Sequence, residues 1–194
     1  MQYSRTKTDS LAGLPDGEQD ESSSKQQKND HLMQTALLQE LFTKELQDML
    51  WAEVQLLNLW NALQQVVSDS LGIMLAKSIT ESVVQIQRLR SIVEKLLNLR
   101  ANPQKCQGMA GLIAEANLLI THTQQITKIR DVAIIMAMQK INRYKVTSYE
   151  AMTALAEMRG QVMIKQLLSD SLMEEKENEK NLAIVFGGLT DKLR

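Results

Sequence analysis

Four charged side chains interrupt stretches of otherwise apolar helical periodicity. Glu53 lies in one stretch, Lys145 in a second, and Glu175 and Glu179 in a third. An isolated ionised carboxylate among apolar side chains costs several kcal/mol unless it is paired, so these residues are the candidates for buried chemistry. A small rotation of its helix would instead place Glu53 at the surface, where its charge needs no partner. The way in which the helices that carry these side chains pack determines whether the charges are buried or lie at the surface.

The composition favours a single domain of packed helices. Of the 194 residues, 44% are hydrophobic and 23% are charged, which is a globular balance. The two prolines, Pro15 and Pro103, lie outside the periodic stretches, and eight glycines supply little turn material for a sheet of many strands. Eleven methionines against two phenylalanines indicate a core of flexible, unbranched side chains, which suit helix packing.

Apolar residues spaced three and four apart predict four long helices and one short helix. Ser68-Asp69-Ser70 supplies capping side chains before the second long helix, and Asn102-Pro103 interrupts the chain after it. Gly160 ends the third long helix, and Gly187-Gly188 follows the fourth. The predicted ranges are about 37–67, 71–98, 108–120, 131–159 and 162–185.

Four long helices with a short crossover helix after the second match a ferritin-like antiparallel four-helix bundle. We expect this all-α bundle over residues 34–188. Residues 1–33 are rich in Ser, Gln, Lys, Asp and Glu and show no apolar period, so we expect a disordered polar tail there. Residues 189–194 are expected to form a C-terminal tail.

A set of residues distributed along the expected bundle carries a family resemblance. They are Leu41-Phe42, Glu45-Leu46, Asp48 and Ala52-Glu53, then Lys105-Cys106, Gly111-Leu112-Ile113 and Glu115-Ala116-Asn117, then Arg130-Asp131, Tyr144, Ser148-Tyr149 and Leu155-Ala156, and finally Leu172 and Glu174-Glu175-Lys176. In this order and spacing the chain resembles the YciE/YciF-type ferritin-like family of bacterial stress-associated proteins, over roughly Leu41 to Leu182.

The resemblance implies a dinuclear iron or manganese site at the centre of the bundle. Such a site takes one Glu from each of two helices and a Glu-x-x-His pair from each of the other two, because residues three apart point the same way on a helix. Glu53 keeps the first-helix position and Glu175 the fourth, with Asn178 at the histidine spacing. At the second-helix position the sequence has Thr80 and Val83.

The ligands that the resemblance implies are depleted. Glu81 lies one residue away from the ligand face of the second helix. The third helix has Asn142, Arg143 and Lys145 where family members tend to carry Glu, His and Glu. Both histidines of the chain, at positions 31 and 122, lie outside the four long helices predicted above. We therefore do not expect the usual dinuclear centre, nor any other bound cofactor.

We hypothesise that Lys145 has replaced the metal, with its ammonium between the carboxylates of Glu53 and Glu175. Arg143 or Asn142 would complete the hydrogen bonding of this charge cluster. The alternative is a residual site for one hard cation, iron or manganese, which carboxylate oxygens bind without histidine. Its ligands would be Glu53, Glu81, Glu175 and Glu179.

The remaining residues of chemical interest have structural interpretations. Cys106 follows a break and matches the family's Lys-Cys pair, so it is either a redox thiol or, as we favour, a half-buried packing cysteine. Tyr144 and Tyr149 would serve oxygen activation in an active ferritin-like oxidase, but with few ligands left we expect them to pack with hydrogen-bonded hydroxyls. Trp51 and Trp60 are expected in packing or dimer contacts.

Charge and cysteine content narrow the function classes. With 22 basic and 23 acidic residues the formal net charge is -1, so no broad field attracts nucleic acid or an anionic membrane. No continuous apolar run marks a signal peptide or a membrane span. One cysteine allows no internal disulfide, which favours a reducing, cytoplasmic compartment.

Three functions of different class follow. The first is a non-catalytic, stress-associated ferritin-like protein that acts through its surface as a homodimer. The second is a metalloprotein that binds or oxidises iron or manganese, and a helical adaptor that docks through its polar head is a third. We find no phosphate-binding loop, dinucleotide fingerprint, nucleophile elbow or Cys-x-x-Cys pair. No catalytic residue is therefore assigned, and a non-enzymatic role is favoured.

Overall fold

The computed structural model describes residues 17–123 and 127–191, with side chains over residues 26–123 and 128–191. All regular secondary structure in these residues is helical, with no strand among them. The helices are α1 (Gly17–Leu63), α2 (Asp69–Arg90), a π-helical turn η1 (Ser91–Leu96), α3 (Gln107–His122), α4 (Thr127–Met158) and α5 (Val162–Asp191). Contacts divide the chain into two units, Met1–Gln39 and Glu40–Arg194, and the second unit is the bundle.

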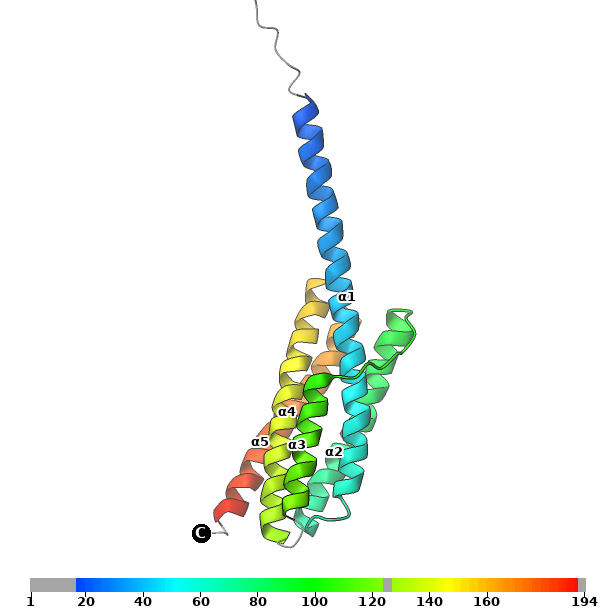
Figure 1. Cartoon of the computed structure of the whole chain (residues 1–194). Helices are drawn as coiled ribbons and strands as arrows, with labels where there is room; N and C mark the ends of the chain where they lie inside the picture. Colours follow the sequence, from blue (N-terminus) through cyan, green and yellow to red (C-terminus); the bar gives the residue numbers. More distant parts are fainter. Residues whose placement is uncertain (1–16, 124–126, 192–194) are drawn as a thin grey trace, which may run out of the picture. The chain divides into compact units, whose positions relative to one another are not determined.

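Within the second unit, α1 and α2 run antiparallel and are joined by a short turn (Figure 1). The chain then crosses over through residues 97–106 and α3, which bring it back to the start of α4. As a result α4 runs parallel to α2, and α5 returns antiparallel to α4. Four long helices with one long connection after the second form a ferritin-like bundle, so the predicted fold class is confirmed.

The core is one cluster of apolar side chains to which all five α-helices contribute. Each long helix turns inward a seam of residues three and four apart. Trp60 is buried in this cluster, and Trp51 packs against it. The seams include Phe42, Leu46 and Leu56 of α1, Leu75 and Leu89 of α2, Ile134 and Ile141 of α4, and Leu168 and Leu182 of α5.

The crossover is fastened to α1 by the side chain of Gln47. Its Nε2 donates to the carbonyl oxygen of Arg100 at 3.1 Å, and its Oε1 accepts from the backbone N–H of Asn102 at 2.9 Å. Just before these contacts, Asn98 has a φ of 51°, the left-handed conformation that often follows a helix end. The buried Gln47 therefore fixes the path by which the chain leaves η1 and reaches α3.

Helix α1 begins inside the segment that was predicted to be a disordered tail. Because α1 begins at Gly17, residues 17–33, which we expected in the disordered tail, are helical, whereas residues 1–16 lie outside the described residues. Gln, Glu and Lys are common in this segment, and they are strong helix formers even where no apolar seam exists. At its other end α1 stops at Leu63 rather than near residue 67.

The end of α5 differs from its prediction as well. Gly187-Gly188 predicted the end of the helix, but α5 continues through this pair to Asp191, while residues 192–194 lie outside the described part of the chain. Among the described glycines the left-handed conformation occurs at Gly160, with a φ of 65°, and not at Gly187 or Gly188. Gly160 therefore ends α4 as predicted, and the other two are interior helix residues.

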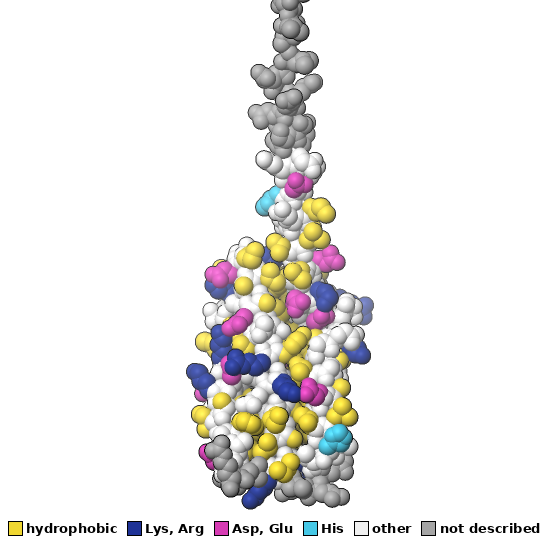
Figure 2. Space-filling model, turned by 60° about the vertical axis from the view of Figure 1, so that its left-hand side comes forward, with side chains coloured by type: hydrophobic (Ala, Val, Ile, Leu, Met, Phe, Trp, Pro, Cys, Tyr) yellow, Lys and Arg dark blue, Asp and Glu magenta, His cyan; other side chains and the backbone are white. Residues whose placement is uncertain are grey.

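The bundle surface mixes charges of both signs. On the face in Figure 2, Lys and Arg side chains lie beside Asp and Glu side chains, with hydrophobic side chains between them. Ion pairs such as Lys176–Glu150 and Lys165–Glu157 link α5 to α4 across this surface. No helix within residues 17–123 or 127–191 combines the length and apolar character that crossing a membrane requires.

Alanine at Gly187 or Gly188 should stabilise the protein. A Cβ at either position meets open space, and Ala is favoured over Gly inside a helix by about 0.5–1 kcal/mol. Gly160→Ala is the opposite control and should destabilise by about 1 kcal/mol, because an L side chain is strained in the left-handed conformation. Urea unfolding of the three variants measures these changes. Destabilisation by Gly187→Ala would mean that α5 ends at the glycine pair.

Candidate functional site

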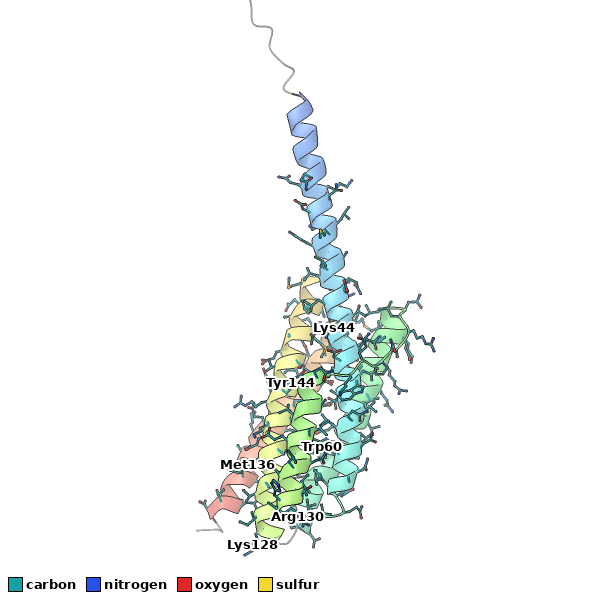
Figure 3. The ribbon with its side chains drawn as sticks, viewed as in Figure 1. Lys44, Trp60, Lys128, Arg130, Met136 and Tyr144 are labelled. Carbon is teal, nitrogen blue, oxygen red and sulfur yellow. The ribbon has the colours of Figure 1, made fainter. Side chains whose placement is uncertain are left out.

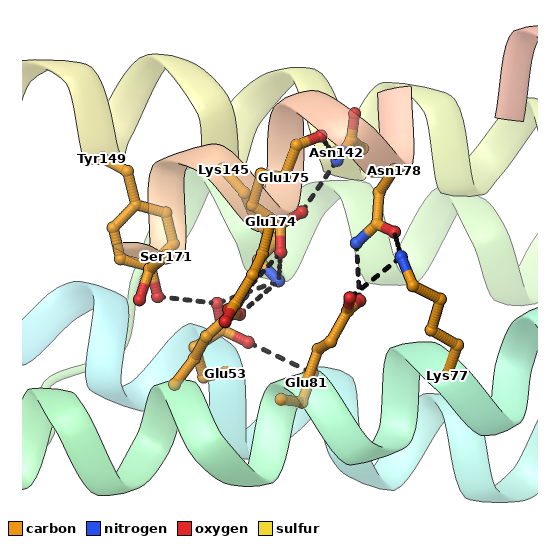
Figure 4. Close-up of polar contacts among 12 residues, drawn as sticks. Glu53, Lys77, Glu81, Asn142, Lys145, Tyr149, Ser171, Glu174, Glu175 and Asn178 are labelled. Atoms are coloured by element: carbon orange, nitrogen blue, oxygen red, sulfur yellow. Dashed lines mark hydrogen bonds and ion pairs between the residues drawn. The ribbon is translucent and has the colours of Figure 1, made fainter. Parts of the chain in front are cut away.

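Lys145 lies at the centre of the bundle between two carboxylates (Figure 4). Its Nζ is 3.0 Å from Glu53 Oε1 and 2.7 Å from Glu175 Oε1. The three side chains come from α4, α1 and α5, and all are buried, Glu53 completely. The structure thus brings together the three residues that the interrupted apolar seams singled out.

Glu53 receives two further hydrogen bonds. The hydroxyl of Tyr149 donates to its Oε1 at 3.1 Å, and the hydroxyl of Ser82 donates to its Oε2 at 3.2 Å. Both hydroxyl residues are themselves buried. With Lys145, three donors from α2 and α4 surround one carboxylate, so both of its oxygens are satisfied inside the protein.

Glu175 is held by two amides. Gln85 Nε2 donates to its Oε1 at 2.8 Å, and Asn142 Nδ2 donates to its Oε2 at 2.7 Å and to its backbone carbonyl at 3.0 Å. The carbonyl oxygen of Gln85 accepts a hydrogen bond from Lys145 Nζ at 2.9 Å. Gln85 therefore positions the ammonium and the carboxylate at once, and it ties α2 to both α4 and α5.

Helical spacing explains why these side chains meet. Ser82 and Gln85 lie three residues apart on α2, Asn142 and Lys145 lie three apart on α4, and Tyr149 follows Lys145 by four. Residues at these spacings project from the same face of a helix. Helix α2 therefore delivers two polar side chains to the centre of the core, and α4 delivers three.

The ligand face predicted for the second helix is wrong, because α2 is rotated about its axis relative to the prediction. Thr80 and Val83 were expected to face the centre, but both are exposed, and Ser82 faces it instead. A signal for this register was present, because Ser82 lies one heptad from both Leu75 and Leu89, which are buried core residues. Small hydroxyl residues are frequent at surfaces as well, so this signal alone is weak.

Burial and neighbouring charges shift the pKa values of the cluster in opposite directions. Burial lowers the pKa of Lys145, but the carboxylates of Glu175 and Glu53 together raise that pKa above its ordinary value. Burial, together with the charge of Glu175, raises the pKa of Glu53, and the contacts with Lys145 and Tyr149 offset only part of that rise. Burial, and next the charge of Glu53, raise the pKa of Tyr149, so its hydroxyl stays a donor. The amine of Lys145 is therefore protonated, and it cannot act as a nucleophile, because a nucleophilic amine has to be neutral.

Arg143, Glu81 and Glu179 lie outside this central cluster. Arg143, predicted to belong to it, has a side chain that is 75% exposed and pairs with Glu179 at 2.5 Å. Consecutive helical residues point about 100° apart, so Arg143 cannot share the face of the residue before it. Glu81 pairs with Lys77 at 2.9 Å and accepts a hydrogen bond from Asn178 at 2.7 Å.

The central residues as arranged do not fit a dinuclear metal site. The ammonium of Lys145 lies within hydrogen-bond distance of both Glu53 and Glu175, where a metal bridged by the two acids would have to lie. Ser82 and Gln85 have the spacing of a Glu-x-x-His pair but offer a hydroxyl and an amide in place of a carboxylate and an imidazole. Within residues 17–123 and 127–191, no three His, Cys, Asp or Glu residues are grouped to hold a metal ion.

Cys106 and Tyr144 form a second contact, at the start of the crossover helix. Cys106 is buried, and its Sγ accepts a hydrogen bond from the backbone N–H of Met109 at 3.5 Å, which caps α3. Tyr144 projects from α4 (Figure 3). Its hydroxyl lies 3.0 Å from the same Sγ. Burial, and then the contact with the thiol, raise the pKa of Tyr144. The pair joins α3 to α4, as the packing interpretation expects.

Comparison with known proteins supplies the family. The family model described as "Domain of unknown function (DUF892)" matches residues 37–192. The chain belongs to the DUF892 family. Protein YciF of Escherichia coli (strain K12) is 34% identical to it over 151 residues, which cover 77% of this DUF892 chain and 90% of YciF. The resemblance to YciE/YciF-type proteins is therefore confirmed.

Solved structures share the DUF892 bundle. The crystal structure of the E. coli stress protein YciF matches with a TM-score of 0.75 at 32% identity, covering 80% of this chain and 98% of that one. YcfI from Rhodopseudomonas palustris, described as a candidate structural protein, matches with a TM-score of 0.71 at 26% identity, covering 75% and 92%. Nearly the whole of each relative therefore corresponds to the bundle of this chain.

Lys145→Met should destabilise this DUF892 bundle by about 3–5 kcal/mol, because it leaves two buried carboxylates without their cation. Lys140→Met is the matched control on the same helix. Lys140 pairs with Glu115 at the surface, and an exposed pair contributes less than about 1 kcal/mol. Chemical unfolding of both variants measures the difference. Equal, small losses would show that the central ammonium does not compensate buried charge.

The stability contributed by Glu174, beside the cluster, should disappear in acid. Its carboxylate pairs with Arg88 at 2.7 Å and accepts a hydrogen bond from Gln85 at 3.0 Å. Burial raises the pKa of Glu174, but these partners together lower it below its ordinary value. A lowered folded-state pKa stabilises the fold above the unfolded value of about 4.3, and this is lost as pH falls through the folded-state pKa.

Unfolding free energies of the unmodified protein and of Glu174→Gln test this pH dependence. The two should differ by a constant amount from about pH 7 to about pH 5 and converge below about pH 4. A difference that persists unchanged at about pH 3 would contradict the sign of the pKa shift.

Proposed function

We propose that this protein is a non-catalytic, stress-associated bundle protein in which a buried lysine has replaced the metal centre of a ferritin-like fold. The observation that carries the proposal is the Lys145 ammonium, 3.0 Å from Glu53 and 2.7 Å from Glu175. A cation at this point compensates the carboxylates by itself, so the four helices need no metal to stay together. An ammonium has neither an open coordination position nor a lone pair, so it supports no metal-like catalysis.

The relatives support the remaining parts of the proposal. YciF is described as a stress protein and YcfI as a candidate structural protein. We assign a role of the same kind to this chain, exerted through the outer surface of the bundle by a cytoplasmic homodimer without a bound cofactor. The formal net charge of -1 and the single cysteine are in keeping with that location and with a protein partner rather than a nucleic acid.

Residual binding of iron or manganese is the competing function. It is favoured by one observation, namely that Glu53 and Glu175 face each other across the bundle at the depth where bridging acids lie in ferritin-like proteins. For a metal to enter, the ammonium of Lys145 would have to leave or lose its proton. The raised pKa of this lysine disfavours loss of the proton, and departure of the ammonium would break its two ion pairs.

Metal content distinguishes the two functions. Protein purified after growth with added iron and manganese should hold far less than one metal ion per chain, and a chelator should leave the melting temperature unchanged, since a ligand that does not bind cannot stabilise. Lys145→Ala is the informative variant, because it frees both carboxylates, and a gain of metal by this variant alone would support the replacement. Near-stoichiometric metal that both Glu53→Ala and Glu175→Ala abolish would reverse the proposal.

A further inference from the structure

A groove lies between α2 and α5, along the first turns of α2. Its volume is about 310 Å³, at the lower end of the range of small-molecule sites. Met74, Leu182 and Val185 form its floor, because they belong to the apolar core or pack against it. Ile73 of α2 and Ile184 of α5 line its rim and are 76% and 72% exposed. Two such side chains beside one hollow form an apolar patch rather than two isolated exposures.

The groove has an apolar end and a polar end. Because α2 and α5 run antiparallel, the start of α2 lies beside the end of α5, and the lining there is mainly apolar. Towards the middle of the bundle, Lys77 Nζ donates to Asn178 Oδ1 at 2.6 Å, and this bond joins the two helices (Figure 4). At 1.5 Å of rise per residue, the stretch of α2 from Ser70 to Lys77 is about 10 Å long.

The polar end offers hydrogen-bond donors to an anion. Lys77 pairs with Glu81 at 2.9 Å and donates to Asn178, which leaves one of its three ammonium protons. Its side chain is 47% exposed, and because an exposed ion pair is weakly held, the ammonium can turn towards a second anion. The hydroxyl of Ser78 and the amide of Asn181 also line this end, and neither has a hydrogen-bond partner among the residues that the structure describes.

We propose that the groove binds a free medium-chain fatty acid, with the carboxylate at Lys77 and Asn181 and the alkyl chain between Ile73 and Ile184. The one charge on its described lining is an ammonium, which selects an anionic head group. No aromatic side chain is among the described lining residues, so the aliphatic walls fit a flexible chain better than a stacked ring. The binding is additional to the role proposed above, because neither Lys145 nor its two carboxylate partners line this groove.

Calorimetric titration of the full chain with octanoate tests the ligand class. Octanoate should bind with a Kd below about 1 mM, whereas octanol, which lacks the charge, and acetate, which lacks the chain, should bind at least about tenfold more weakly. Lys77→Met should weaken octanoate binding about tenfold, because it removes the cation and keeps the stem.

Lys180→Met is the matched control for the head group. Lys180 is a lysine of α5 that is 73% exposed and does not line the groove, so this variant should bind octanoate as the unmodified protein does. Absence of octanoate binding at about 1 mM, octanol binding as tight as octanoate binding, or equal effects of the two substitutions would overturn the proposal.

Methyl NMR of methionine-labelled protein tests the location. Octanoate should shift the Met74 methyl signal and leave that of Met173, which is 63% exposed on α5 outside the groove. Ile184→Asn should weaken binding about tenfold, and Met173→Asn should not. Circular dichroism verifies that each variant stays folded. An unchanged Met74 signal, or full affinity in Ile184→Asn, would place the ligand elsewhere and overturn the proposal.

Sedimentation distinguishes the fatty acid from a second copy of the chain as the occupant of the groove. Addition of octanoate should leave the oligomeric state of the unmodified protein unchanged, because the groove takes a small ligand within one chain. A dimer that Ile184→Asn dissociates, in a protein that binds no octanoate, would assign the groove to the second copy and overturn the proposal.

Discussion

The burial of one ammonium between two carboxylates is the constraint on which the rest of the bundle depends. Lys145, Glu53 and Glu175 lie on three of the four long helices, and Ser82 and Gln85 bring in the fourth. Turning any of these helices by one residue, about 100°, would leave a buried charge or amide without its partner. Apolar side chains alone tolerate such rotations better, so the cluster specifies how each helix is turned about its axis.

A lysine at this place differs from a metal in what it permits. A metal ion changes its oxidation state, exchanges ligands and leaves when it is chelated, and each event changes the charge of the core. The ammonium of Lys145 is covalently part of α4, and its raised pKa keeps it protonated across the physiological range. Under the proposed replacement of the metal, the charge that this ammonium contributes would not change with metal supply or redox conditions.

The sequence predicted the fold well because helical periodicity survives a few substitutions. Spacings of three and four identified every long helix, and the charged interruptions at Glu53, Lys145 and Glu175 lie at the same depth in the structure. What it did not predict were neutral partners. Gln85 and Asn142 are as ordinary at a surface as in a core, and only the packed helices show that their amides complete a buried network.

The wrong predictions for Arg143 and for Gly187-Gly188 have a common cause. Residue type alone fixes neither the direction in which a side chain points from its helix nor the backbone conformation. Arg143 carries the right charge for the cluster, but it follows Asn142 on α4 and therefore points to solvent. Gly187 and Gly188 looked like a helix end because glycine often is one, whereas the backbone that distinguishes them from Gly160 is set by packing and not by residue type.

The thiol of Cys106 can report on local opening of the structure at the start of α3. Cys106 is the single cysteine of the chain, it is buried, and its sulfur caps the first turn of α3 while contacting Tyr144. A thiol reacts with an alkylating reagent only when it is exposed, so labelling of Cys106 requires that this turn open. The rate of labelling under native conditions therefore measures the free energy of opening the crossover, separately from the unfolding of the four-helix core around Lys145.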